Sequence, residues 1–340
     1  MTEHSLPIPH AIPRVTADTA RKLQITLGAI WLIDGVLQIQ PFMFSRSFVT
    51  QIIAPNAADQ PGLIAAPIRV VAHLIEPRVA LFNLLAITIQ VLIGVGVMYR
   101  PTVKPALLVS FAWALGVWWI GEGLGGLFTG NASPLTGAPG AALLYVLAGL
   151  IVWPRARSRT EAAGVGGVLG ERGARVSWAL LWFGFAALWL LPANRAQATV
   201  HDAIANAPSG AHWLAGIQTT AASAAAGHGL AIALVAAGLA AAVGLSALFA
   251  RCATPALVLA IVIGLVYFVL GQGMGGILTG SGTDPGTGPL IILLAISIYS
   301  LRRSAQPRTW RKRHSSQTPQ RLSFPVDANS PSPDVRPATR

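Results

Sequence analysis

Long stretches without a charged side chain constrain the fold of this chain more than any other feature of its sequence. Residues 79–99 (VALFNLLAITIQVLIGVGVMY) and 230–250 (LAIALVAAGLAAAVGLSALFA) are two such stretches, each close to the roughly 20 residues that a helix needs to cross a bilayer. Neither shows the period-two alternation of a membrane β-barrel. Only 11% of the residues are charged, against about 25% in soluble domains. The sequence therefore predicts an all-α, polytopic membrane protein.

Eight apolar segments fit this prediction. We expect transmembrane helices at residues 23–41, 79–99, 105–121, 138–153, 176–192, 229–250, 255–271 and 287–301. The first segment is not a cleaved secretory signal, because no small-residue cleavage motif follows it and a second copy of it occurs deep in the chain. Residues 1–22 form a polar N-terminal segment. Residues 302–340 form a basic tail, rich in Pro, Ser and Arg, that we expect to be disordered.

The positive charges orient these helices. With a cytoplasmic N-terminus, twenty of the 24 Lys and Arg residues lie on the cytoplasmic side and only Arg46, Arg69, Arg78 and Arg195 lie outside. Because Lys and Arg next to spans are retained in the cytoplasm, we expect both termini there. We predict a multi-pass protein of the bacterial inner membrane, whose basic tail contacts anionic lipids rather than nucleic acid. A membrane-protein partner and a homo-oligomer are both left open.

An internal repeat divides the chain. The tripeptide Pro-Ala-Leu at 105–107 recurs at 255–257, 150 residues later, and Trp31 matches Trp182 at an offset of 151. We therefore expect a tandem duplication of a four-helix unit. Because four is an even number, both units enter the membrane in the same sense, and their pseudo-axis lies along the membrane normal. The two repeats and the cytoplasmic linker between them are expected at residues 23–153, 176–301 and 154–175.

A glycine-rich decapeptide belongs to this repeat and reads GEGLGGLFTG at 121–130 and GQGMGGILTG at 271–280. Glycines four residues apart on a helix form a flat strip that lets another backbone approach closely. We interpret both decapeptides as helix-packing strips that lead into a tight outer hairpin, with packing glycines Gly121, Gly125, Gly126, Gly130, Gly271, Gly275, Gly276 and Gly280. They are not dinucleotide or phosphate loops, because no strand precedes them and no Gly-Lys-Ser/Thr follows. The functional alternative is a polar vestibule lined by irregular outer segments.

Asp34 is the ionisable residue that the sequence places deepest in a span, about 17 Å from its inner end at 1.5 Å per residue. A carboxylate there costs a few kcal/mol, which makes it a candidate functional group. Gln38 shares its helix face one turn further on. Phe185 and Trp189 occupy the equivalent positions of the second repeat, so a polar site here belongs to the first repeat alone. The alternative interpretation is a protonated Asp34 that hydrogen-bonds to a neighbouring helix.

Glu122 and Gln272 are the only ionisable difference between the two decapeptides. Both side chains can hydrogen-bond among the glycines, but only Glu122 can carry a charge. Arg78, at the start of the second span, lies at the same outer level and is the expected counter-ion, and Asn83 continues the polar face down that helix. We therefore predict a ligand or ion site drawn from Asp34, Gln38, Arg78, Asn83, Glu122 and Gln272.

No motif indicates catalysis or a bound metal. The histidines show no i, i+4 pair on one helix and no His-Glu-x-x-His, and the chain has no nucleophile elbow. The single Cys252 excludes a multi-cysteine metal site. We predict no catalytic residue, no metal and no cofactor.

The segment RKLQITLGAIWLIDGVLQIQPFMF (21–44), together with the four-helix unit, resembles the DoxX-like family of small bacterial membrane proteins. The resemblance implies a four-helix membrane bundle and, for some relatives, a link to quinone-reducing complexes; it transfers no catalytic residue. The sequence favours a non-enzymatic accessory subunit, or a carrier of a small solute, with an outward-facing polar site. The alternative is a membrane subunit of a quinone-linked oxidoreductase that binds a quinone between the repeats.

Overall fold

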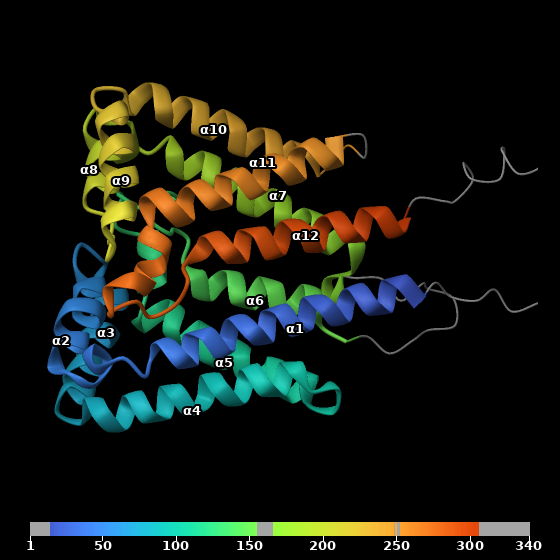
Figure 1. The fold of residues 1–340 in the computed structure, drawn as a ribbon, viewed down its shortest axis with the longest axis horizontal. Coiled ribbons are helices and arrows are strands. Elements are labelled where there is room, and N and C mark those ends of the chain that lie inside the picture. The colour runs from blue at the N-terminus through green and yellow to red at the C-terminus, as the bar shows by residue number, and fades with distance from the viewer. Residues whose placement is uncertain (1–13, 155–165, 248, 250–251, 306–340) are drawn as a thin grey trace, which may run out of the picture. The chain divides into compact units, whose positions relative to one another are not determined.

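The computed structural model describes residues 14–154, 166–247, 249 and 252–305, and its regular elements within these ranges are all helical (Figure 1). The predictions for the N-terminal segment up to residue 13, for residues 155–165 of the linker and for the tail from residue 306 lie outside the described residues. The all-α prediction is confirmed for the part of the chain that the structure describes.

A long or apolar helix lies at each of the eight predicted places. In the first half these are α1 (Arg14–Leu37), α4 (Val79–Met98), α5 (Val103–Ile120) and α6 (Ala141–Val152). In the second half they are α7 (Gly170–Trp189), α10 (Gly229–Ser246), α11 (Ala253–Val266) and α12 (Thr287–Ala305). A π-helical turn continues α11 to Gly271.

Four helical stretches are long and apolar enough to cross a membrane. They are Gly62–Met98, Arg100–Ile120, Gly229–Ser246 and Ala253–Gly271 among the residues described. The first of them bends at a 3-10 turn, Glu76–Arg78, where α3 (Gly62–Ile75) ends and α4 begins. By length and composition the chain is thus a membrane protein with at least these four candidate spans.

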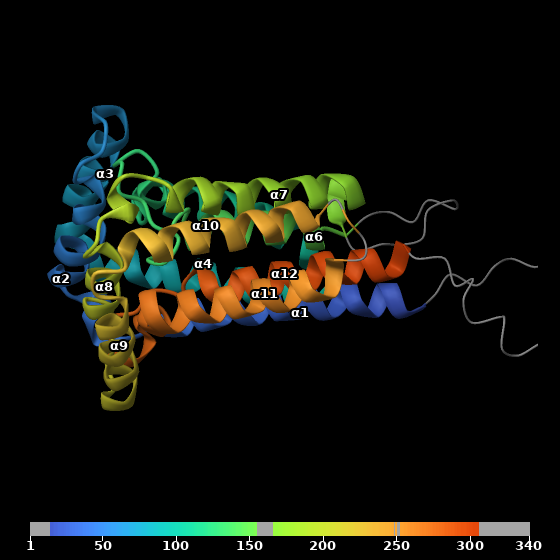
Figure 2. The same ribbon diagram turned by 90° about the horizontal axis from the view of Figure 1, so that it is seen from above.

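Short helices lie across one end of the long ones, where the sequence predicts only outer loops (Figure 2). Besides α3, they are α2 (Arg46–Phe48), α8 (Thr199–Ala205) and α9 (His212–Ala225). The loop prediction is wrong for α3 because apolar residues recur there with helical spacing: Ala65, Ile68, Ala72 and Ile75 are buried on one face. They pack in a small core of their own with Met43, Phe48, Val49 and Ile53.

Glycines mediate the packing between α1 and α4. A Cβ added to Gly28 would lie 2.8 Å from the carbonyl oxygen of Gly94, and one added to Gly94 would lie 2.9 Å from the oxygen of Gly28. The two helix backbones therefore touch through small residues, as is common between helices in membranes. In the second half, the corresponding helices α7 and α10 also pack against each other.

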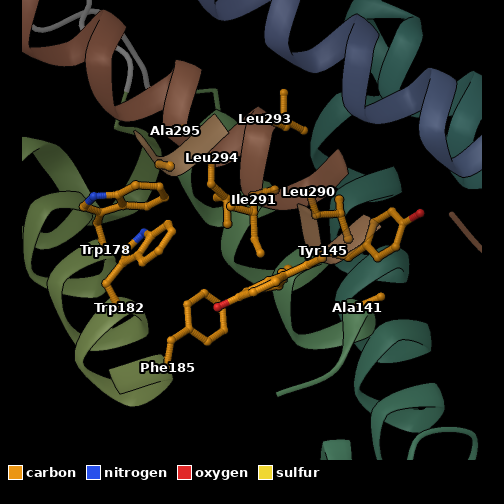
Figure 3. Close-up of a cluster of buried hydrophobic side chains, with 14 of the residues drawn as sticks. Ala141, Tyr145, Trp178, Trp182, Phe185, Leu290, Ile291, Leu293, Leu294 and Ala295 are labelled. Carbon is orange, nitrogen blue, oxygen red and sulfur yellow. The ribbon is translucent and has the colours of Figure 1, made fainter. Parts of the chain in front are cut away.

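A large apolar core joins the two halves of the described chain. Figure 3 shows Trp178, Trp182 and Phe185 of α7 facing α12, with Tyr145 of α6 on the other side. The rings of Trp182 and Phe185 meet edge to face, with centroids 5.3 Å apart. The described residues up to Ser304 accordingly form one compact unit.

Hydrogen bonds also connect each half to a loop of the other. Gln38 and Gln40, at the end of α1, donate to the carbonyl oxygens of Thr283 and Gly282 in the loop before α12, at 3.4 Å each. Reciprocally, the Asn194 amide, just beyond α7, donates to the carbonyl oxygen of Ala132 in the loop before α6 at 2.7 Å. Side chains of each half therefore bind the backbone of the loop that precedes the fourth long helix of the other half.

Candidate functional site

The two glycine decapeptides each form a left-handed turn. After α5 ends, the φ angles of Gly123, Leu124, Gly125 and Gly126 are +53°, +54°, +65° and +68°. The second copy, residues 273–276, repeats this with φ of +51°, +57°, +69° and +65°. The predicted helical strip is wrong here, since a left-handed turn breaks a right-handed helix. Glycine is favoured at the other positions of each turn because a side chain in this conformation costs roughly 1–2 kcal/mol per residue, a cost that Leu124 and Met274 carry.

The turn glycines also differ in how much space surrounds them. A Cβ on Gly125 would collide with the carbonyl oxygen of Pro139, and one on Gly275 with that of Asp284. The close approach therefore involves loop backbone rather than a second helix. At four other glycines an added Cβ would collide with nothing. Its nearest neighbour would lie 3.7 Å away at Gly126 and 3.5 Å away at Gly276. At Gly280 it would meet only Gln40, at 3.9 Å, and at Gly130 nothing within 4 Å. Gly121 meets its own helix, and Gly271 meets the backbone of Leu135 in the first half.

Glu122 and Gln272 hydrogen-bond at the beginning of the following helix. The backbone N–H of Ala142, in the first turn of α6, donates to Glu122 Oε1 at 3.0 Å. The N–H of Thr287, the first residue of α12, donates to Gln272 Oε1 at 2.8 Å, and Gln272 Nε2 donates to the Thr287 hydroxyl at 2.8 Å. Both side chains thus satisfy N–H groups that a helix start leaves without partners. Gly140 and Gly286 make room, since a Cβ there would collide with Glu122 and Gln272.

The predicted ion pair between Glu122 and Arg78 is wrong. Arg78 is exposed at the turn between α3 and α4, and the one ion pair found among the described residues joins Arg175 to Glu171. Both residues were predicted at the same outer level of their helices, but a shared level does not make two side chains face each other. Asn83 is fully buried, and its amide donates to the backbone carbonyl oxygen of Gln38 at 2.7 Å. This hydrogen bond connects α4 to the end of α1.

A second carboxyl group approaches Glu122 from the other half of the chain. Burial, together with the charge of Asp284, raises the pKa of Glu122 to about 8, against the opposing effect of the Ala142 N–H. Burial also raises the pKa of Asp284, although the Thr283 hydroxyl and the Gly286 N–H donate to it. Asp284 belongs to one of the irregular outer segments of the vestibule hypothesis, but it was not predicted as a site residue because Thr-Asp-Pro-Gly is typical of a surface turn.

Two cavities meet at these carboxyl groups. The outer vestibule has a volume of about 870 Å³ and is lined by both halves, including Asn56, Glu122, Asn194, Asp202, Gln272 and Asp284. The inner cavity, of about 280 Å³, lies among α1, α4, α5 and α6 and extends to Asp34 and Gln38. Both cavities are lined by Gly121, Glu122, Ala141, Thr283 and Asp284. The structure therefore supplies the polar vestibule that the sequence analysis gives as an alternative.

Asp34 lies in the wall of the inner cavity with one carboxylate oxygen free. The hydroxyl of Tyr145 donates to Asp34 Oδ2, whereas Oδ1 has no hydrogen-bond partner among the described residues. Asp34 is 2% exposed. Tyr145 lies on α6, more than a hundred residues along the chain, and no sequence signal connected the two. Of the six predicted site residues, Asp34, Gln38 and Glu122 line the inner cavity, Gln272 lines the vestibule, and Arg78 and Asn83 line neither.

The second half has an apolar counterpart of the inner cavity. Its volume is about 450 Å³, and its walls include Trp189, Ala236, Tyr267 and Leu270 but no Asp or Glu. The Trp189 indole N–H donates to the Tyr267 hydroxyl at 2.8 Å, so these two polar groups satisfy each other. In the sequence alignment of the two halves, Phe185 and Trp189 correspond to Asp34 and Gln38.

Within the described ranges, no three His, Cys, Asp or Glu side chains are grouped so that they could hold a metal ion. Comparison of the chain with protein-family models, curated proteins and solved structures gave no match. The resemblance to DoxX-like proteins therefore stays a prediction. The described chain is that of a helical membrane protein with a partly polar cavity.

Proposed function

We propose that this protein is a non-enzymatic membrane protein that binds a small solute in the inner cavity, as a carrier or as the accessory subunit of a membrane complex. The observation that carries the proposal is the pair of cavities that share Glu122 and Asp284 and end at the buried Asp34. A mostly apolar pocket with a few convergent polar groups is the usual form of a small-molecule site. An unpartnered carboxylate oxygen in its wall offers a ligand a hydrogen bond that the protein does not use.

The proposal includes eight spans in two parallel DoxX-like repeats of the bacterial inner membrane, with both termini in the cytoplasm. Two features support it. α3 and α9 both have 14 residues and begin 150 residues apart, so the added elements follow the repeat as well. Arg21 donates to the carbonyl oxygen of Met98, which puts this basic residue at the end of the helices remote from the vestibule. Under the positive-inside rule the vestibule then opens away from the cytoplasm.

A quinone is the second candidate for the ligand. A quinone carbonyl accepts hydrogen bonds, and the indole N–H groups of Trp31 and Trp113, both in the cavity wall, have no partner among the described residues. The chain would then serve a quinone-linked oxidoreductase as a membrane subunit. An absorption spectrum of the purified protein separates this candidate from a colourless solute.

The test is to purify the full chain in mild non-ionic detergent and to identify small molecules that remain bound by mass spectrometry. Ala86→Phe is the blocking variant, because Ala86 is buried in the wall of the inner cavity. Ala236→Phe is its matched control, since Ala236 lies 150 residues later and lines the second-half cavity. We expect one small molecule to be enriched with the parent and with Ala236→Phe, and reduced about tenfold or more in Ala86→Phe. Equal enrichment in all three proteins, or loss in Ala236→Phe alone, would refute the proposed site.

A further inference from the structure

The ionisable groups around the two cavities all have the same sign. The vestibule is lined by Glu122, Asp202 and Asp284, and the inner cavity by Asp34, Glu122 and Asp284. Among the described residues that line either cavity there is no Lys, Arg or His, although the whole chain has 24 Lys and Arg against 12 Asp and Glu. A bound cation favours the ionised forms of these acidic groups, whereas an anion would find no positive side chain among them. Anionic solutes are therefore disfavoured.

The inner cavity also has more free acceptors than the protein can satisfy. Asp34 Oδ1, Gln38 Oε1 and Gln90 Oε1 have no partner among the described residues, and these side chains are 2%, 5% and 6% exposed. All three residues line the inner cavity. Buried acceptors normally have a partner, and leaving one without a partner costs stability. A ligand that donates several hydrogen bonds would satisfy them.

Aromatic side chains form much of the remaining wall. Trp31, Phe82 and Trp113 line the inner cavity, and the Trp31 ring lies against the ring of Tyr145, with centroids 4.3 Å apart. Aromatic faces attract cations, most strongly where water is excluded. The same faces, with aliphatic residues such as Ile53 and Val117, bury apolar surface of a ligand.

We propose that the inner cavity binds a compact organic cation, an ammonium group attached to an apolar body. The inference rests on the proposed function, because it gives the chemical class of the solute at the same site. The ammonium group supplies a positive charge and three donors for the acceptors near Asp34, and the apolar body lies against the indole rings. Glu122 and Asp284, where the cavities meet, present carboxyl oxygens to the cation on its way from the vestibule, and its positive charge favours their ionised forms.

Three probes that share a phenyl ring and differ in their polar end test this class: 2-phenylethylammonium, 2-phenylethanol and phenylacetate. Binding to the full chain in non-ionic detergent is measured by calorimetry and by quenching of tryptophan fluorescence, since two indoles line the cavity. We expect the ammonium probe to bind about tenfold or more tightly than the alcohol, and phenylacetate to bind weakest of the three.

Asp34→Asn is the decisive variant, because it keeps the shape of the side chain and removes its charge. We expect it to weaken the ammonium probe about tenfold or more while the alcohol changes less than about twofold. Gln90→Met, which removes a free acceptor and keeps the length of the side chain, should weaken the ammonium probe several-fold and provides the test if Asp34→Asn does not fold. Glu171→Gln, whose carboxylate pairs with Arg175 away from both cavities, is the matched control and should change nothing.

The outcomes separate this inference from the proposed function. If ammonium and alcohol bind equally and Ala86→Phe blocks both, the cavity binds a solute but the cationic class is wrong. Tightest binding of phenylacetate, or an unchanged ammonium affinity in both Asp34→Asn and Gln90→Met, also overturns the inference. If none of the probes binds, the cationic class is rejected, and the co-purification experiment alone then decides the proposed function.

Discussion

Among single residues, Glu122 and Gln272 have the same structural role in the two halves, and this role does not explain why only Glu122 can carry a charge. Both side chains accept a hydrogen bond from the first turn of the next helix, so a hydrogen-bonding side chain is needed in both places. Gln272 satisfies this need without a charge. Glu122 adds a carboxyl group beside Asp284, where the two cavities meet. The cap therefore needs a hydrogen-bonding side chain but not an acid.

The substitution Glu122→Gln tests this division. The pKa of Glu122 rises from 4.5 to about 8 on burial, so between these values the folded protein holds a proton that the unfolded chain has released. The free energy of unfolding of the parent therefore falls as the pH rises from about 4.5 to about 8. Glu122→Gln keeps the cap and should remove this part of the fall, so we expect a smaller loss of thermal midpoint between about pH 5 and about pH 8.

Its control is Glu171→Gln, in which the lost carboxylate pairs with Arg175 at a partly exposed site. That variant should retain the pH dependence of the parent. A Glu122→Gln protein with the parental pH dependence would show that Glu122 is ionised in the folded state throughout this range. A large loss of stability at all pH values would instead mean that glutamine cannot form the cap in the first half.

At the scale of elements, the two left-handed turns show what a glycine pattern can and cannot reveal. The spacing of four predicts close backbone approach, and Gly125 and Gly275 do lie against other backbone. The same spacing fits a helical strip and a left-handed turn equally well, so the conformation could not be predicted from it. The glycines that bring two long helices together, Gly28 and Gly94, are single residues on separate helices, and no local pattern distinguishes them.

Three Gly→Ala variants separate the two causes of the glycine requirement. Gly125→Ala combines positive φ with a collision at Pro139 and should lower the free energy of unfolding by about 2–4 kcal/mol. Gly130→Ala has φ of +80° but open space and should cost about 1–2 kcal/mol. Gly116→Ala, within α5 and also in open space, should stabilise by about 0.5–1 kcal/mol.

The order of the three variants is the measured quantity, from thermal or denaturant unfolding in the same detergent. The second half gives an independent series, because Gly275→Ala should behave like Gly125→Ala and Gly238→Ala, in α10 with open space around it, like Gly116→Ala. If Gly130→Ala is as harmful as Gly125→Ala, backbone conformation alone explains the requirement and the collision with Pro139 is relieved by small movements.

At the scale of the whole molecule, the sequence predicted the long helices well and the contacts between distant segments poorly. Each of the eight apolar segments contains a helix, because a charge-free run of this length is a strong local signal. α3 and α9 were not predicted because each has only 14 residues, fewer than a helix needs to cross a bilayer. Within the site, Asp34, Gln38 and Glu122 were found from their own unusual positions, whereas Tyr145 and Asp284 reach the cavity only through folding.

The orientation of the molecule can be tested with the single native cysteine. Cys252 is exposed and belongs to the predicted cytoplasmic side, between α10 and α11. A membrane-impermeant maleimide should therefore leave it unlabelled in intact cells and label it after permeabilisation. In a Cys252→Ser background, Thr219→Cys on the exposed face of α9 should react in intact cells. The reverse labelling pattern would invert the proposed topology and turn the vestibule toward the cytoplasm.

The hydrogen bonds between each half and a loop of the other have a consequence for biosynthesis. Asp34, on α1, is synthesised well before Asp284, which lies in the wall of the same cavity and directly precedes α12. The amides of Gln38 and Gln40 have no loop to bind until then. A nascent chain in which α1, α4, α5 and α6 have been made therefore still has an incomplete cavity, and the wall around the carboxylate is completed only when the loop before α12 has been translated.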